Sequence, residues 1–256
     1  MVKQSPFLLN HLYCNYVNTA MQRILVITLS FAAAYLLLAC KKQTVPVYVA
    51  PQIPSVLYKN YLALGDSYTI GQSVAAAERF PAQTINILSK DSINFNVPEY
   101  IAQTGWTTRN LISAVNTMPP LKTSYDFVTL LIGVNNQYQG RSQAEYATEF
   151  TELLNTAIQY AGNRTKRVAV LSIPDWSVTP FANGRDRALI ALQIDSFNVI
   201  NKQIALARGV NYIDITASTR MAATDPTLIA TDGLHPSGNE YSKWAVLLAV
   251  IIKLSL

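Results

Sequence analysis

The sequence predicts a doubly wound α/β sandwich, in which helices cover both faces of one parallel sheet. After residue 60, five apolar runs of strand length alternate with amphipathic stretches of helical spacing. Several of these runs are almost continuously apolar, which is typical of strands buried on both faces of a parallel sheet. Of the 256 residues, 50% are hydrophobic and 14% are charged, which argues against a disordered chain. We therefore expect one α/β/α domain with a five-stranded parallel sheet.

The expected strands are the runs rich in Val, Ile and Tyr. They are YLALG at 61–65, a weaker run near 93–102, FVTLLIG at 127–133, VAVLSI at 168–173 and VNYIDI at 210–215. Parallel strands of one sheet are joined by right-handed crossovers, so helices should lie between them.

Three of these helices are predicted, two of them by apolar spacing and end signals. Ser142 and Glu145 form an S-x-x-E capping box, and apolar residues then recur at helical spacing until Gly162. A second helix shows the same spacing before Gly209, and a third runs over about 238–253.

The first 40 residues have the features of an export segment. Arg23 precedes a mostly apolar stretch at 24–39, and Cys40 follows it. The stretch is shorter than the ~20 residues of a spanning helix, which favours a signal peptide over the alternative, a transmembrane anchor. The ending LLAC resembles the lipobox of bacterial lipoproteins. That resemblance implies that Cys40 is lipidated and holds the protein on a membrane surface of the cell envelope, facing the periplasm or the exterior.

Residues 41–59 contain Pro46, Pro51 and Pro54, and we expect them to form an extended tether before a domain at 60–256. Met21 is an alternative start to Met1, because the positively charged region of the leader begins there.

Charge and cysteine content exclude several classes of function. Residues 41–256 carry 18 basic and 15 acidic side chains, and the basic ones are scattered, which argues against a nucleic-acid partner. Two cysteines form neither a disulfide framework nor a cysteine-rich metal site. We expect no metal and no other cofactor.

The candidate catalytic residues follow the strands, at the sheet edge where such folds bind ligands. Ser67 lies in LGDSYTIG after the first strand, and His235 in DGLHPSG is the only histidine after residue 40. A serine hydroxyl needs a base such as imidazole, and the imidazole needs a carboxylate, which Asp232 offers three residues earlier. Taken alone, each motif is also ordinary: Gly, Asp and Ser are common turn residues, and an isolated histidine often serves packing.

Four blocks in order, GDSYTIG, TGW, LIGVNN and DGLHPSG, resemble the SGNH (GDSL-like) hydrolases. The resemblance implies a flavodoxin-like fold, Ser67 as nucleophile, and Asp232 and His235 as its catalytic partners. It also implies that Ser67, Gly105 and Asn135 supply the oxyanion hole. The sequence departs from the family pattern at Tyr68, where GDSL has leucine, and at Asn136, where aspartate is frequent.

We therefore expect a serine esterase that forms an acyl-enzyme, acting on short-chain acyl esters such as acetylated glycans. The alternatives are a lysophospholipase or lipase, and a surface lipoprotein that binds a glycan or lipid without turnover. Asp66 is expected to fix the turn as a hydrogen-bond acceptor. The aromatic residues that follow the strands are candidates to line the cleft, and core packing or loop closure is an equal alternative for each of them: Tyr68, Trp106, Tyr138, Trp176 and Phe181.

Overall fold

The computed structural model describes residues 18–19, 21–23 and 57–256. The chain divides into two units, residues 1–54 and 55–256, and the few described residues of the first are helical. Cys40, the apolar stretch at 24–39 and most of the predicted tether lie outside the described residues. Lipidation, export and the choice of start therefore stay predictions. Within the described ranges, no helix combines the length and apolarity needed to cross a membrane.

The described part of the second unit contains one five-stranded parallel sheet with the order β2-β1-β3-β4-β5. The strands are β1 (Tyr61–Gly65), β2 (Glu99–Ala102), β3 (Phe127–Leu131), β4 (Val168–Leu171) and β5 (Asn211–Ile213). All five lie inside the runs predicted from the sequence, and the α/β class is confirmed. β1, β3 and β4 are buried along their whole length, as their continuous apolar sequences predict.

The register of the sheet brings the strand ends together. Gly65, the last residue of β1, is paired with Ala102 at the end of β2 and with Leu131 at the end of β3. The loops that leave these three strands therefore begin side by side at the carboxyl edge of the sheet.

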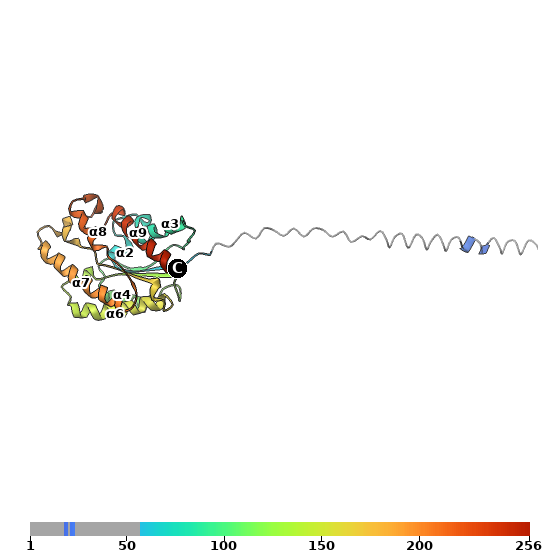
Figure 1. The fold of residues 1–256 in the computed structure, drawn as a ribbon, viewed down its shortest axis with the longest axis horizontal. Coiled ribbons are helices and arrows are strands. Elements are labelled where there is room, and N and C mark those ends of the chain that lie inside the picture. Colours follow the sequence, from blue (N-terminus) through green and yellow to red (C-terminus); the bar gives the residue numbers. More distant parts are fainter. Residues whose placement is uncertain (1–17, 20, 24–56) are drawn as a thin grey trace, which may run out of the picture. The chain divides into compact units, whose positions relative to one another are not determined.

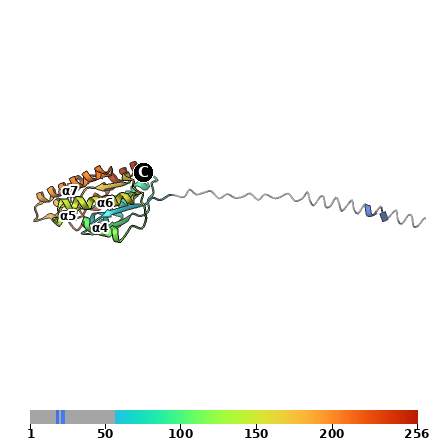
Figure 2. The same cartoon turned by 90° about the horizontal axis from the view of Figure 1, so that it is seen from below.

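Helices cover both faces of the sheet (Figure 1). On one face α3 (Phe80–Ser89) packs against α9 (Gly238–Ser255), and on the other α6 (Gln143–Tyr160) contacts both α4 (Thr108–Thr117) and α7 (Arg187–Ala207). Figure 2 shows α4, α6 and α7 from their own side of the sheet. The short helices are α2 (Ser67–Ile70), α5 (Val134–Tyr138) and α8 (Thr216–Arg220). Single turns of 3₁₀ helix lie at Ala76–Glu78, Thr165–Arg167, Trp176–Val178, Pro180–Ala182, Met221–Ala223 and Pro226–Leu228.

The end signals of α6 act only in part as the sequence predicts. The Ser142 side chain accepts a hydrogen bond from Glu145 N over 3.1 Å, and Gly162 lies just beyond the helix at φ +66°. The Glu145 carboxylate, however, lies 3.4 Å from Arg141 Nη1 instead of closing the box on the Ser142 backbone. The prediction of a full capping box was wrong, because the neighbouring cation competes for the carboxylate.

Aromatic packing joins α3 to α9. Trp244 is fully buried, with its ring centroid 5.9 Å from that of Phe80 and 4.9 Å from that of Tyr241. Burial of one such side chain contributes about 1.5–3 kcal/mol. At the start of the domain, Lys59, the last residue of the predicted tether, already pairs with Phe95 beside the sheet.

Candidate active site

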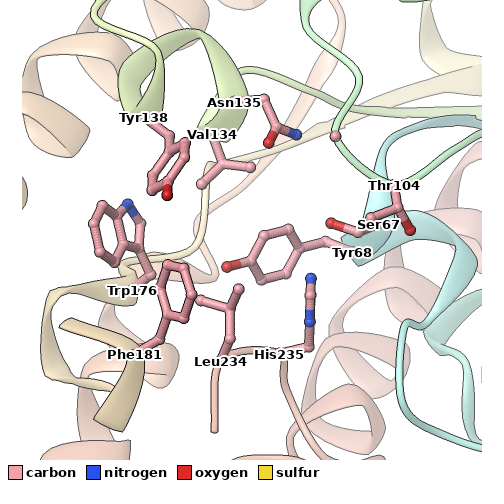
Figure 3. Close-up of a pocket in the computed structure, with 11 residues that line it drawn as sticks. Ser67, Tyr68, Thr104, Val134, Asn135, Tyr138, Trp176, Phe181, Leu234 and His235 are labelled. Carbon is pink, nitrogen blue, oxygen red and sulfur yellow. The ribbon is translucent and has the colours of Figure 1, made fainter. Parts of the chain in front are cut away.

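A cavity of about 170 Å³ opens at the carboxyl edge of the sheet (Figure 3). Loops that follow all five strands contribute to it. The lining residues are Ser67, Tyr68, Thr104, Gly105, Val134, Asn135, Tyr138, Trp176, Phe181, Leu234 and His235. Four of the predicted site residues, Ser67, Gly105, Asn135 and His235, therefore share one cavity, although they are spread over most of the domain sequence.

A tight turn after β1 presents Ser67. Ser67 is the first residue of α2, so its backbone N–H has no acceptor within the helix. A Cβ added at Gly65 would lie 2.1 Å from Thr69 Oγ1 and 2.4 Å from Leu131 O, so α2 can approach β1 and β3 this closely only above a glycine.

The buried Asp66 caps α2 by accepting a hydrogen bond from Tyr68 N over 3.0 Å, which is the turn-fixing role expected from the sequence. Burial raises the pKa of this carboxyl to about 7, against the opposing effect of its backbone hydrogen bonds.

His235 and Asp232 form a direct pair. Nδ1 of the imidazole lies 2.6 Å from Asp232 Oδ2, and Figure 3 shows the other ring nitrogen directed towards Ser67. Burial raises the pKa of Asp232, but hydrogen bonds from Ser73, from the His235 ring and from two backbone N–H groups outweigh it and lower the pKa to about 2. Asp232 is therefore ionised at neutral pH and suited to hold an imidazole that carries its proton on Nδ1.

The loop that carries His235 is fixed on both sides. Ala230 N donates to His235 O over 2.7 Å, and Ser237 N donates to Leu228 O over 2.9 Å. Phe181 N also donates to Gly233 O over 3.0 Å, which attaches this loop to the one after β4. The histidine is therefore held by a bonded loop and is 6% exposed.

Gly105 and Asn135 border the cavity near Ser67. Gly105 has φ +82°, a conformation that favours glycine, and a Cβ placed there would meet no atom within 4 Å. The Asn135 side chain donates one hydrogen bond from Nδ2 to Trp106 O over 2.9 Å. That bond leaves the second hydrogen of this amide without a partner among the described residues.

One side of the cavity is an aromatic wall, formed by Tyr138, Trp176 and Phe181. Their ring centroids lie 5.6–6.1 Å apart, and the Arg185 guanidinium lies 5.1–5.4 Å from all three. Trp176 is further fixed by a 2.8 Å hydrogen bond from Nε1 to Gln137. The rings of the wall are therefore held by contacts with one another and with Arg185.

Sequence reasoning placed four of five aromatic residues correctly. Trp106 lies outside the cavity lining and packs, partly buried, against the core, which is the alternative role that the sequence left open. Thr104, Val134 and Leu234 were missed, although each is adjacent in sequence to a predicted site residue. Asn136 follows Asn135 but is buried away from the cavity. In the described part of the chain, no three His, Cys, Asp or Glu side chains are grouped as a metal site would require.

Solved structures of other proteins share this fold. A lipase/acylhydrolase from Enterococcus faecalis is 17% identical, with a TM-score of 0.58 over 76% of this chain and 95% of that one. A lipase from a goat rumen metagenome is 20% identical, with a TM-score of 0.60 over 75% and 97%. Axe2, an acetylxylan esterase from Geobacillus stearothermophilus, is 19% identical, with a TM-score of 0.58 over 76% and 94%. Among curated protein sequences, none matched this chain.

The family model described as GDSL-like lipase/acylhydrolase matches residues 63–241. The match begins within β1 and ends within α9, so it contains every loop that lines the cavity. The protein is thus an ester-hydrolysing enzyme with a five-stranded α/β fold. The chain belongs to the GDSL-like lipase/acylhydrolase family.

Proposed function

We propose that the protein is a serine esterase in which Ser67, His235 and Asp232 act as a catalytic triad. The observation that carries the proposal is the 2.6 Å contact between His235 Nδ1 and Asp232 Oδ2 at the cavity that Ser67 also lines. The carboxylate accepts the Nδ1 proton, so Nε2 keeps its lone pair for the Ser67 hydroxyl.

The reaction proceeds in two halves. The Ser67 oxygen attacks the ester carbonyl carbon while Nε2 of His235 takes its proton. The C–O bond to the alcohol then breaks, and His235 returns the proton to the leaving oxygen, which leaves an acyl-enzyme. Water, deprotonated by His235, attacks that acyl group, and Ser67 recovers its proton as the acid departs. Throughout, ionised Asp232 stabilises the imidazolium.

Negative charge on the carbonyl oxygen would be stabilised by the backbone N–H groups of Ser67 and Gly105 and by the Asn135 amide. All three residues line the cavity, and Ser67 N lies at the free end of α2. Donors fixed before the reaction stabilise the developing charge without reorganisation.

The proposed substrates are short-chain acyl esters, such as acetylated glycans. A cavity of about 170 Å³ is small, and the buried ring of Tyr68 occupies part of its lining. Tyr138 and Phe181 are exposed at 46% and 41%, so the aromatic wall offers ring faces on which a sugar can stack. The esterase neighbour named for acetylxylan agrees with this choice, while the two neighbours named as lipases keep long acyl chains as the second candidate.

We also propose that the enzyme works at the cell envelope, attached through lipidated Cys40. The support is the LLAC sequence after an apolar stretch. Mass spectrometry of the mature N-terminus tests this: a diacylglyceryl-modified Cys40 as first residue is expected, and an unmodified chain that begins before residue 40 would contradict it.

The catalytic proposal is tested with Ser67→Ala and a fluorophosphonate probe. We expect the wild type to be labelled at Ser67 and the variant to lose both labelling and turnover of p-nitrophenyl acetate, with an unchanged melting temperature. Unchanged turnover in the variant would refute the assignment, and a wild type that binds esters without labelling would indicate a binding protein. Comparison of p-nitrophenyl acetate, p-nitrophenyl octanoate and acetylated xylan tests the substrate class, and a clear preference for octanoate would favour the lipase alternative.

A further inference from the structure

The Asp232 carboxylate accepts four hydrogen bonds. Oδ1 accepts the backbone N–H groups of Leu234 and His235, each over 3.0 Å. Oδ2 accepts His235 Nδ1 over 2.6 Å and the hydroxyl of Ser73 over 2.7 Å. Three of the four donors belong to the loop of Asp232 itself. Ser73 is the exception, since it lies 159 residues earlier, just after the helix that carries Ser67.

Ser73 has an unusual backbone conformation. Its φ is +65°, a region that residues with a Cβ rarely adopt. The residue is exposed, so burial in the core does not force this conformation. Such a conformation persists where the surroundings require it, and here it places the hydroxyl on the oxygen that also holds the catalytic imidazole.

We propose that Ser73 is a positioning residue, which fixes the Asp232 carboxylate so that the His235 ring keeps its free nitrogen directed at Ser67. The inference rests on the proposed triad. Asp232 has a side chain 29% exposed and bonds its own loop through Oδ1, so without Ser73 the imidazole is the one remaining donor to Oδ2 among the described residues. Ser73 also ties the nucleophile's segment to the histidine loop.

The hydroxyl affects charge as well as position. The Ser73 hydrogen bond partly neutralises the negative charge on Oδ2, so the carboxylate attracts the protonated imidazole less strongly. Its removal should let the carboxylate stabilise the imidazolium more strongly, so the acid limb of the rate profile should move to higher pH. The other ionisable groups around the ring are Tyr68 of α2, at 5.1 Å between ring centroids, and Asp175 and Glu240, which line a small cavity beside it. All three are retained in the variants below.

The test compares Ser73→Ala with Ser73→Gly. Both remove the hydroxyl, but glycine also relieves the positive φ, so Ser73→Gly should melt no lower than the wild type. We expect both variants to lose about 10-fold in kcat for p-nitrophenyl acetate, with KM changed less than about twofold. We also expect the acid limb of the pH–kcat profile to move upward in both. Ser92→Gly is the matched control, because Ser92 has φ +61° and lies outside the cavity lining; its kcat should equal that of the wild type.

Recovery of full kcat in Ser73→Gly would overturn the proposal, since it would show that only backbone strain mattered. An unmoved acid limb in both variants would also overturn it. Failure of the triad itself would be recognised separately, because the wild type would then not be labelled by the fluorophosphonate at Ser67. If the wild type is labelled normally and the Ser73 variants keep the kcat and the pH profile of the wild type, the triad stands and the positioning role of Ser73 is refuted.

Discussion

Asn136 and Thr108 hold each other through two hydrogen bonds. Asn136 Nδ2 donates to Thr108 Oγ1 over 2.6 Å, and Asn136 Oδ1 accepts from Thr108 N over 3.0 Å. The Thr108 hydroxyl donates in turn to the buried carboxylate of Glu149, which Arg109 pairs at 2.7 Å. These bonds connect the residue after Asn135 to the first turn of α4, three residues beyond Gly105, and so fix two of the proposed oxyanion donors relative to each other.

The network predicts that aspartate at position 136, frequent in the family, is unfavourable here. Asn136→Asp would place an acceptor against Thr108 Oγ1, whose proton is already given to Glu149, and add a second buried carboxylate. We expect a loss of about 2–3 kcal/mol in unfolding free energy at pH 7, measured by denaturant titration. Adding Glu149→Gln should restore part of it. Asn86→Asp, on the exposed side of α3, is the control, and equal stability of the two aspartate variants would contradict the network.

Asn135→Ala tests the oxyanion hole. Because the amide is proposed to bind charge that develops only during the reaction, kcat for p-nitrophenyl acetate should fall about 100- to 1000-fold while KM changes little. Steady-state kinetics gives both parameters, and fluorophosphonate labelling of Ser67 should slow as well. A loss below about 10-fold would remove Asn135 from the proposed oxyanion hole.

Tyr68→Leu tests what limits the acyl group. The Tyr68 ring is buried, lines the cavity and packs on His235, so leucine, the residue of the GDSL string, should open space next to the base. We expect the octanoate-to-acetate ratio of kcat/KM to rise about 10-fold. The exposed Tyr58→Leu should leave the ratio unchanged. An unaltered ratio in Tyr68→Leu would show that chain length is selected elsewhere.

Asp66 should make stability depend on pH. The pKa of its carboxyl is raised from 3.8 to about 7 in the folded protein. The folding stability that its protonated form contributes is therefore fully present below about pH 4 and is lost as pH rises through 7. Asp66→Asn keeps a neutral acceptor for Tyr68 N and removes this titration. We expect the ionisation of Asp66 to lower the melting temperature of the wild type, but not of the variant, between pH 5 and pH 7.5. Parallel curves of melting temperature against pH for the wild type and Asp66→Asn would contradict the assignment. Asp225→Asn is the control, because the pKa of the Asp225 carboxyl is lowered and this group does not titrate between pH 5 and pH 7.5.

Most of the fold could be predicted from the sequence because the apolar runs and the helical spacing indicated the same alternation of strands and helices. Apolar runs predicted all five strands, although the run that contains β2 is weaker than the others, and helical spacing predicted α6, α7 and α9. α3 and α4 were missed because each is only 10 residues long. FPAQTINILS in α3 contains a proline and β-branched residues, which weaken a helix prediction, and α4 is largely polar.

The candidate site was predictable where a residue lies at the end of a strand. Ser67, Gly105 and Asn135 follow β1, β2 and β3, whose ends the sheet aligns, whereas His235 lies well beyond β5 and was found as the only histidine after residue 40. Ser73 and Thr108 could not be found in the same way, since their partners depend on loop conformation and on residues far along the chain. Trp106 follows a strand, as the other aromatic candidates do, but the path of the loop after β2 directs its ring onto the core.

The close approach of α2 to Gly65 limits how this enzyme can diversify. Because no side chain fits at that position, random mutagenesis of it would yield inactive or unfolded proteins, whatever change of selectivity is sought. Directed-evolution libraries should therefore keep codon 65 constant and place their variation at Tyr138 and Phe181, whose exposed rings can change without disturbing the nucleophile.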